Sequence, residues 1–268
     1  VRASSFIVIG FLVLMLGYIF KQGYSALSWE FLSAMPRDEM TAGGIFPAIL
    51  GTFYLMIGAT VISVPVGVIT AVYLTEYASN PRIVKIIRLG INNLAGVPSV
   101  VFGLFGLGLF VVYFNLGVSI LAGSLTLGIL NLPVIIRSTE EALLTVPQRF
   151  RVASRSLGAT RWQTIREVVL PNALPGILTG VILGLERAAG ETAPILFTVA
   201  AFYLPRLPNS PMDQTMSLPY HLYVISTQVP GMPIDVQYGT ALVLLVLVLG
   251  MNVAAAITRS RFRRKRQW

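Results

Sequence analysis

The sequence contains no cysteine, a single histidine and few charged residues. With no cysteine and one histidine, structural disulfides, thiolate metal sites and a Cys/His catalytic pair are excluded. We assign neither a metal site nor a catalytic residue to the chain. Only 12% of the 268 residues are charged and 55% are apolar, whereas roughly a quarter of the residues of a soluble domain are charged. Because the apolar residues form long blocks between charged segments, the chain is predicted to be an integral membrane protein.

The apolar blocks include six stretches that are long enough to cross a membrane, for which a helix needs ~20 residues. They cover residues 4–20, 47–75, 93–114, 118–136, 175–201 and 238–258. Each block is continuously apolar rather than alternating, which favours helices over the strands of a barrel. The predicted fold is therefore an all-α integral membrane protein with about six transmembrane helices, and Pro65 and Pro98 predict kinks.

Basic residues gather on one side of these spans. Sixteen of the twenty lysines and arginines lie before the first span, in two of the loops, or in the tail 259–268. They are Arg2, Arg82, Lys85, Arg88, Arg137, Arg149, Arg151, Arg155, Arg161, Arg166, Arg259, Arg261, Arg263, Arg264, Lys265 and Arg266. Because positive residues favour the cytoplasmic side, both termini and the loop 137–174 are predicted to be cytoplasmic. Their place beside the spans indicates contact with membrane lipid and not with nucleic acid.

The loop 137–174 is predicted to contain short helices. Ser138 and Thr160 each begin a capping-box pattern, with a glutamate or glutamine three residues later. Pro147 suits the first turn of a helix that Gly158 would end, and the last helix is expected to stop at Pro171. Such helices either brace the bundle at the membrane surface or dock a partner, and their amphipathic pattern alone favours neither.

The segment VASRSLGATRWQTIREVVLP at 152–171 resembles the cytoplasmic EAA loop of ABC-transporter permeases. It departs from that motif at Val152, where glutamate is usual, and at Ser154, where alanine is frequent. The resemblance implies a coupling helix that docks into an ATP-binding subunit, and Val152 cannot supply the charge that glutamate would bring to this interface. The residues expected to form this coupling loop are Ala153, Ser154, Leu157, Gly158, Ala159 and Thr160.

The chain itself has no G-x-x-x-x-G-K-[ST] run, the phosphate-cradling loop of many ATPases. Its only lysines are Lys21, Lys85 and Lys265. We therefore expect that this chain is not an enzyme and holds no cofactor. ATP and magnesium would bind to a separate ATPase chain.

The fifth apolar block contains three ionisable residues, Glu186, Arg187 and Glu191. An isolated charge at the bilayer centre costs about 2.5–3.5 kcal/mol, so pairing is favoured. Arg187 and Glu191 are four residues apart and are predicted to pair near the midplane, whereas Glu186 points elsewhere on the helix. The charges either mark a substrate pathway, fix packing as a buried salt bridge, or relay protons. A ribbon of small residues predicts that another helix packs closely; it comprises Gly176, Gly180, Gly184 and Ala188.

The stretch RAAGETAPILFT at 187–198 resembles the PstA family, the permease subunits of phosphate-specific ABC transporters. Three further stretches agree with that family, at 61–78, 94–106 and 216–224. The resemblance implies a type I ABC-importer permease-like fold in one transmembrane domain, 1–268, with its core at 43–258. It also implies that Arg187 meets the crossing oxyanion and that Glu191 holds Arg187 in place.

The same resemblance implies a function and partners. The expected function is ATP-driven import of inorganic phosphate across a bacterial-type cytoplasmic membrane. The expected partners are a homologous PstC-like permease subunit, a cytoplasmic PstB-like ATPase dimer and an extracytoplasmic PstS-like phosphate-binding protein. The alternatives are a permease for another oxyanion, such as molybdate or sulfate, and a proton-coupled secondary carrier that uses Glu186 and Glu191.

Overall fold

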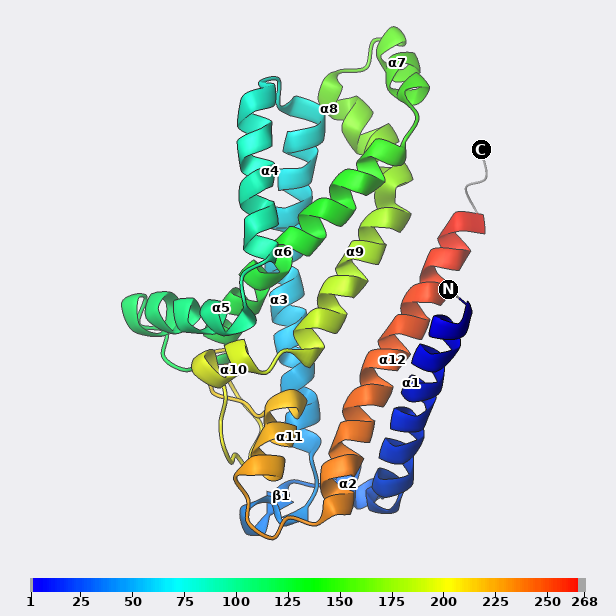
Figure 1. Ribbon diagram of the computed structural model, residues 1–268. Helices are drawn as coiled ribbons and strands as arrows, with labels where there is room; N and C mark the ends of the chain where they lie inside the picture. The colour runs from blue at the N-terminus through cyan, green and yellow to red at the C-terminus, as the bar shows by residue number, and fades with distance from the viewer. Residues whose placement is uncertain (1, 265–268) are drawn as a thin grey trace.

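The computed structural model describes residues 2–264, most of which are helical (Figure 1). The α-helices are α1 (Arg2–Gly23), α2 (Trp29–Ser33), α3 (Phe46–Val72), α4 (Pro81–Ala95), α5 (Ser99–Gly106), α6 (Ile120–Thr145), α7 (Gln148–Ser156), α8 (Arg161–Thr164), α9 (Leu170–Gly190), α10 (Ala193–Thr198), α11 (Leu218–Thr227) and α12 (Ile234–Arg264). The shorter elements are η1 (Tyr24–Ala26), η2 (Asp38–Met40), the π-helices η3 (Tyr73–Tyr77), η4 (Leu107–Tyr113) and η5 (Ile165–Val169), and the antiparallel pair β1 (Pro36–Arg37) and β2 (Ala42–Gly43). Of the predicted basic tail 259–268, residues 265–268 lie outside the described residues.

Within residues 2–264, five helical segments are long and apolar enough to cross a membrane. They are Ser4–Ala26, Phe46–Tyr77, Ile120–Thr145, Arg161–Gly190 and Ile234–Ala254. The pair Pro81–Ala95 and Ser99–Tyr113 makes a sixth crossing if it is counted as one broken span. The prediction of an all-α membrane protein with about six spans is confirmed.

The third expected span, 93–114, is wrong as a single helix. The chain bends by 98° between α4 and α5, at the segment 96–98. Pro98 has no N–H to continue the hydrogen-bond ladder of α4, and it restricts the backbone of Val97 to extended conformations. Pro98 therefore breaks the span, whereas Pro65 lies inside α3, which continues through it.

The fifth expected span, 175–201, is wrong at both ends. The helical segment begins at Arg161, passes through Pro171 and ends at Gly190. The π-helix η5 directly before α9 widens the turn where Pro171 cannot donate a hydrogen bond. At the other end, Glu191 is extended, and Pro194 has no N–H to offer the carbonyl of Gly190.

The short helix expected to start at Ser138 does not form, because Ser138 lies inside the long helix α6. Its hydroxyl donates to the carbonyl of Ile135, one turn earlier in the same helix. The packing of α6 against its neighbours thus overrides the local capping pattern. The second predicted box is confirmed: the Thr160 hydroxyl accepts from the Gln163 amide, and the Gln163 side chain accepts from the Thr160 amide.

Helix α6 is the centre of the bundle, since it packs against both α3 and α9. The predicted small-residue ribbon of α9 forms this contact, with Gly176 facing Ala142 and Gly180 facing Ser138. On the other side, Gly67 of α3 faces Ile135 of α6. Each glycine brings two helix backbones closer than a side chain would allow, so the prediction of close packing is confirmed.

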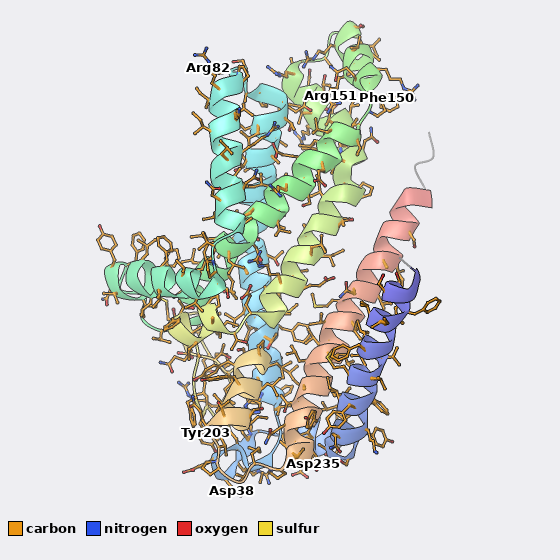
Figure 2. All side chains as sticks on the ribbon, viewed as in Figure 1. Asp38, Arg82, Phe150, Arg151, Tyr203 and Asp235 are labelled. Carbon is orange, nitrogen blue, oxygen red and sulfur yellow. The ribbon has the colours of Figure 1, made fainter. Side chains whose placement is uncertain are left out.

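The bundle has two distinct ends (Figure 1). We call the end with α7 and α8 the loop end, and the end with β1 and β2 the strand end. Helices α1 and α12 stand side by side, and the N-terminal end of α1 and the C-terminal end of α12 both point toward the loop end. Figure 2 shows Arg82 and Arg151 at the loop end and Asp38 at the strand end.

The contact between Gly176 and Ala142 gives a test of this packing. A Cβ atom at residue 176 would lie 2.5 Å from the Cβ of Ala142, which is too close for two carbon atoms. We expect Gly176→Ala to lower the free energy of unfolding by about 1–3 kcal/mol, measured by thermal unfolding in detergent. Gly90→Ala is the matched control, because no atom lies within 4 Å of the added carbon. Equal stability of the two variants would contradict the packing.

Candidate translocation site and coupling loop

The predicted pair of Arg187 and Glu191 is present at the end of α9. Nε of Arg187 donates to Oε1 of Glu191 over 3.2 Å, and the two side chains are 31% and 15% exposed. Arg187 lies in the last turn of α9, where its positive charge also offsets the negative end of the helix dipole. The pair is therefore electrostatically balanced and partly sheltered, and the Arg187 side chain is the more exposed of the two.

The pair lies about half way between the two ends of the bundle. Figure 1 shows α9 ending beside α10, near the middle of the long helices α3 and α12. Helix α5 crosses this level, and its Gly103 faces the carbonyl of Ala193 and Pro194 in α10. Two broken helices thus meet where α9 stops, which is irregular backbone at a depth where a membrane helix is normally continuous.

Glu186, the third residue predicted for the pathway, is half-buried on α9. Of the three predicted residues, Arg187 and Glu191 form an ion pair with each other. Glu186 and Arg187 lie near the end of α9, whereas Glu191 is the extended residue that directly follows this helix.

Asn131 of α6 is a buried polar residue that the sequence analysis missed. Its Nδ2 donates to the carbonyl of Gly184 over 3.0 Å, and its side chain is almost fully buried. Its Oδ1 is also buried and has no hydrogen-bond partner in the structure. Gly184 precedes Arg187 by one turn, so Asn131 fixes α9 directly before the charged pair. A lone asparagine in the apolar block 118–136 was the signal available for finding it.

The predicted coupling loop is a helix–turn–helix projection at the loop end. Helix α7 ends before Gly158, whose φ of +85° is the left-handed conformation expected at a helix end. The hydroxyls of Ser154 and Thr164 lie 3.0 Å apart and join α7 to α8. Serine in place of the usual alanine thus gives this loop an internal hydrogen bond. The Leu157 side chain at the tip is 89% exposed.

A second buried ion pair lies under this loop, and the sequence analysis missed it as well. Nη2 of Arg151 in α7 lies 2.8 Å from Oε1 of Glu76 in η3, and the side chains are 10% and 7% exposed. No local pattern signals this contact, because the two residues are separated by 75 positions. Glu76 lies within the family-like stretch at 61–78.

The lone histidine, His221, lies in α11, outside the candidate spans. It is buried, and burial lowers its pKa to about 4, so the imidazole is neutral near pH 7. That favours a packing role. Across residues 2–264, the His, Asp and Glu side chains form no group of three that could hold a metal ion.

An apolar helical bundle with a charged pair at mid-height and a projecting helical loop at one end is the arrangement that the sequence motifs led us to expect. Residues 63–266 match the family described as binding-protein-dependent transport system inner membrane component. The chain belongs to this family, and it is a permease subunit of the inner membrane rather than a catalytic subunit.

Several proteins are similar to the chain over most of its length. The probable ABC transporter permease protein YqgI of Bacillus subtilis is 36% identical over 264 residues, which cover 93% of this chain and 89% of that protein. The phosphate transport system permease protein PstA of Mycobacterium leprae is 38% identical over 253 residues, 92% of this chain and 82% of that protein. The resemblance inferred from the sequence motifs is confirmed.

Solved structures share the fold. A chain of a bacterial alginate ABC transporter superposes with a TM-score of 0.66 at 15% identity, over 95% of this chain and 89% of that chain. A chain of the inward-facing MetNI methionine ABC transporter gives a TM-score of 0.63 at 22% identity, over 82% of this chain and 94% of that chain. The expected ABC-importer permease fold is therefore confirmed.

Proposed function

We propose that this chain carries inorganic phosphate across the bacterial cytoplasmic membrane as a transmembrane subunit of an ATP-driven importer. The observation that supports this most directly is the Arg187–Glu191 pair, placed half way along the bundle where α5, α9 and α10 meet. Its chemistry suits an oxyanion, and several relatives of the chain are named phosphate transport system permeases.

Arg187 has the donors that a tetrahedral oxyanion requires. A guanidinium presents a planar fork of N–H groups and stays charged at all physiological pH values. Its hydrogen bond to Glu191 uses Nε, which leaves the two terminal nitrogens to face a phosphate. Glu191 and the carbonyl end of α9 both oppose the anion, so binding at this site would be weak enough for release.

The coupling loop would dock into the ATPase dimer, a PstB-like partner that binds ATP and magnesium. Leu157 and Val152 are exposed apolar side chains at the tip of the projection, and Trp162 is exposed beside them. The same segment of the chain carries exposed arginines; they are Arg149, Arg155 and Arg166. The surface suits a groove with an apolar floor and an acidic rim. Ala153, Gly158, Ala159 and Thr160 shape the turn that presents it.

The orientation of the subunit follows from its distribution of charge, and its further partners follow from that orientation and from its exposed apolar surface. Basic residues gather at the loop end, so this end and both termini would face the cytoplasm and its anionic lipids. The strand end would then face outward, toward a PstS-like phosphate-binding protein. A homologous PstC-like permease subunit would complete the membrane domain, because the chain leaves apolar surface exposed along α1 and α5.

The role of Arg187 is tested by Arg187→Gln in the assembled transporter. Loss of a charged hydrogen bond to phosphate should reduce phosphate uptake by about 10- to 100-fold, measured with labelled phosphate in proteoliposomes. Arg82→Gln is the matched control, since Arg82 is an exposed arginine at the start of α4 and lies outside both the Arg187–Glu191 pair and the coupling loop, and uptake should be unchanged. Normal uptake by Arg187→Gln would exclude Arg187 from the pathway.

The docking surface is tested by Leu157→Asp. A buried leucine contributes about 1.5–3 kcal/mol, so ATPase binding to the permease should weaken by roughly 10- to 100-fold in a pull-down titration. Met212→Asp changes another exposed apolar residue, in the segment 202–217, and should leave ATPase binding intact. If both variants bound the ATPase equally well, Leu157 would lie outside the interface.

A further inference from the structure

The buried pair of Glu76 and Arg151 connects three elements at the loop end. Nε and Nη2 of Arg151 donate to Oε1 of Glu76 over 3.1 and 2.8 Å. The remaining donors reach the end of α6: Nη1 donates to the carbonyl of Val146 over 2.6 Å, and Nη2 to that of Leu143 over 2.8 Å. Arg151 therefore ties the first helix of the coupling loop to η3 and to α6 at the same time.

Helix α8, the second helix of the coupling loop, contacts the same turn of η3. Arg161 of α8 donates to the backbone carbonyl of Glu76. Its guanidinium also lies 4.9 Å from the ring centroid of Tyr77, in cation–π contact. Both α7 and α8 thus contact the turn Glu76–Tyr77. Helix α7 binds the buried carboxylate of Glu76, and α8 contacts the backbone carbonyl of Glu76 and the ring of Tyr77.

This turn is the end of the longest continuous helical segment within a candidate span, Phe46–Tyr77. The segment runs from near the strand end to the loop end, and it packs on α6 along much of its length (Figure 1). A displacement of the coupling loop must move this segment or pull Arg151 away from Glu76. Pulling the pair apart leaves an uncompensated buried charge, which is strongly unfavourable. Movement of the segment is therefore the easier response.

There is space beside the pair for such movement. A cavity of about 410 Å³ lies against Glu76 and Arg151, and it is also lined by Thr75, Gln148 and Arg155. The pair itself is well bonded, so the cavity does not loosen it. The coupling loop can shift relative to the membrane surface while the contacts of Arg151 and Arg161 with η3 are kept.

A stability role alone does not require charges at this place, because well-packed apolar residues often stabilise a fold as well as a buried ion pair does. The ion pair differs from apolar packing because it joins α7 to η3 through hydrogen bonds of defined direction. We propose that Glu76 and Arg151 are positioning residues that transmit the displacement of the coupling loop to α3, and so couple ATP hydrolysis to the movement of substrate. This inference rests on the proposed function of the loop.

The test compares Glu76→Gln with Glu140→Gln in the assembled transporter. Glu76→Gln keeps the shape and removes the charge that faces Arg151. Glu140→Gln breaks a different ion pair near the same end, to Arg88 over 3.1 Å, which does not touch the coupling loop. We expect Glu76→Gln to bind the ATPase and hydrolyse ATP, while the phosphate imported per ATP falls by about tenfold. Glu140→Gln should keep the normal ratio.

A second readout does not depend on phosphate. Because the chain has no cysteine, spin labels at Tyr54→Cys on α3 and Val246→Cys on α12, both exposed positions, report the distance between these helices once the partner subunits are made cysteine-free. ATP should change this distance in the unsubstituted chain and in Glu140→Gln, but to a much smaller extent in Glu76→Gln.

The inference is overturned if Glu76→Gln keeps the ratio of phosphate to ATP, or if it keeps the ATP-driven change in distance. A fall in import and hydrolysis in equal proportion to a loss of assembled protein would also overturn it, because that is the result of a merely structural role. If the unsubstituted chain fails to import phosphate but ATP still moves α3, the proposed substrate is wrong and the link stands.

Discussion

The close packing of α6 against α3 and α9 is the constraint on which the rest of the structure depends. Glycines on α3 and α9 face α6 and let the backbones approach, as at Gly67 and Gly176. In a membrane, where lipid is as apolar as leucine, such shape complementarity replaces the hydrophobic effect as the main force between helices. With the three helices fixed together, the end of α9 is held at mid-height and the coupling loop is held at one end.

One ion pair lies at the end of α9, and a second ion pair lies at the loop end. Arg187 and Glu191 lie at the broken end of α9 and are partly exposed. Glu76 and Arg151 are more deeply buried, and Arg151 also donates to two backbone carbonyls at the end of α6. The difference in exposure, and not in residue chemistry, is the reason that we propose a substrate site at the first pair and a structural link at the second.

Sequence patterns predicted the local features and missed those set at long range. Apolar blocks located the spans, and the capping box at Thr160 and the glycine ribbon of α9 were found, because each depends on residues a few positions apart. The uninterrupted course of α6 past Ser138 was predicted wrongly, since tertiary packing decides it. The predicted span 175–201 ran through Gly190, although the missing N–H of Pro194 is a local cause of the break there. The pairing of Glu76 with Arg151 lies beyond any local pattern.

Phosphate selectivity tests the central claim most directly. The chain would be reconstituted in proteoliposomes with its sister permease, its ATPase and its binding protein, and uptake of labelled phosphate would be measured with excess sulfate or molybdate. If the chain is a subunit of a phosphate importer, uptake requires ATP, is lost with vanadate, persists with an uncoupler and is not displaced by the competing anions. Uptake that prefers sulfate or molybdate, or that collapses with the uncoupler and ignores vanadate, would contradict it.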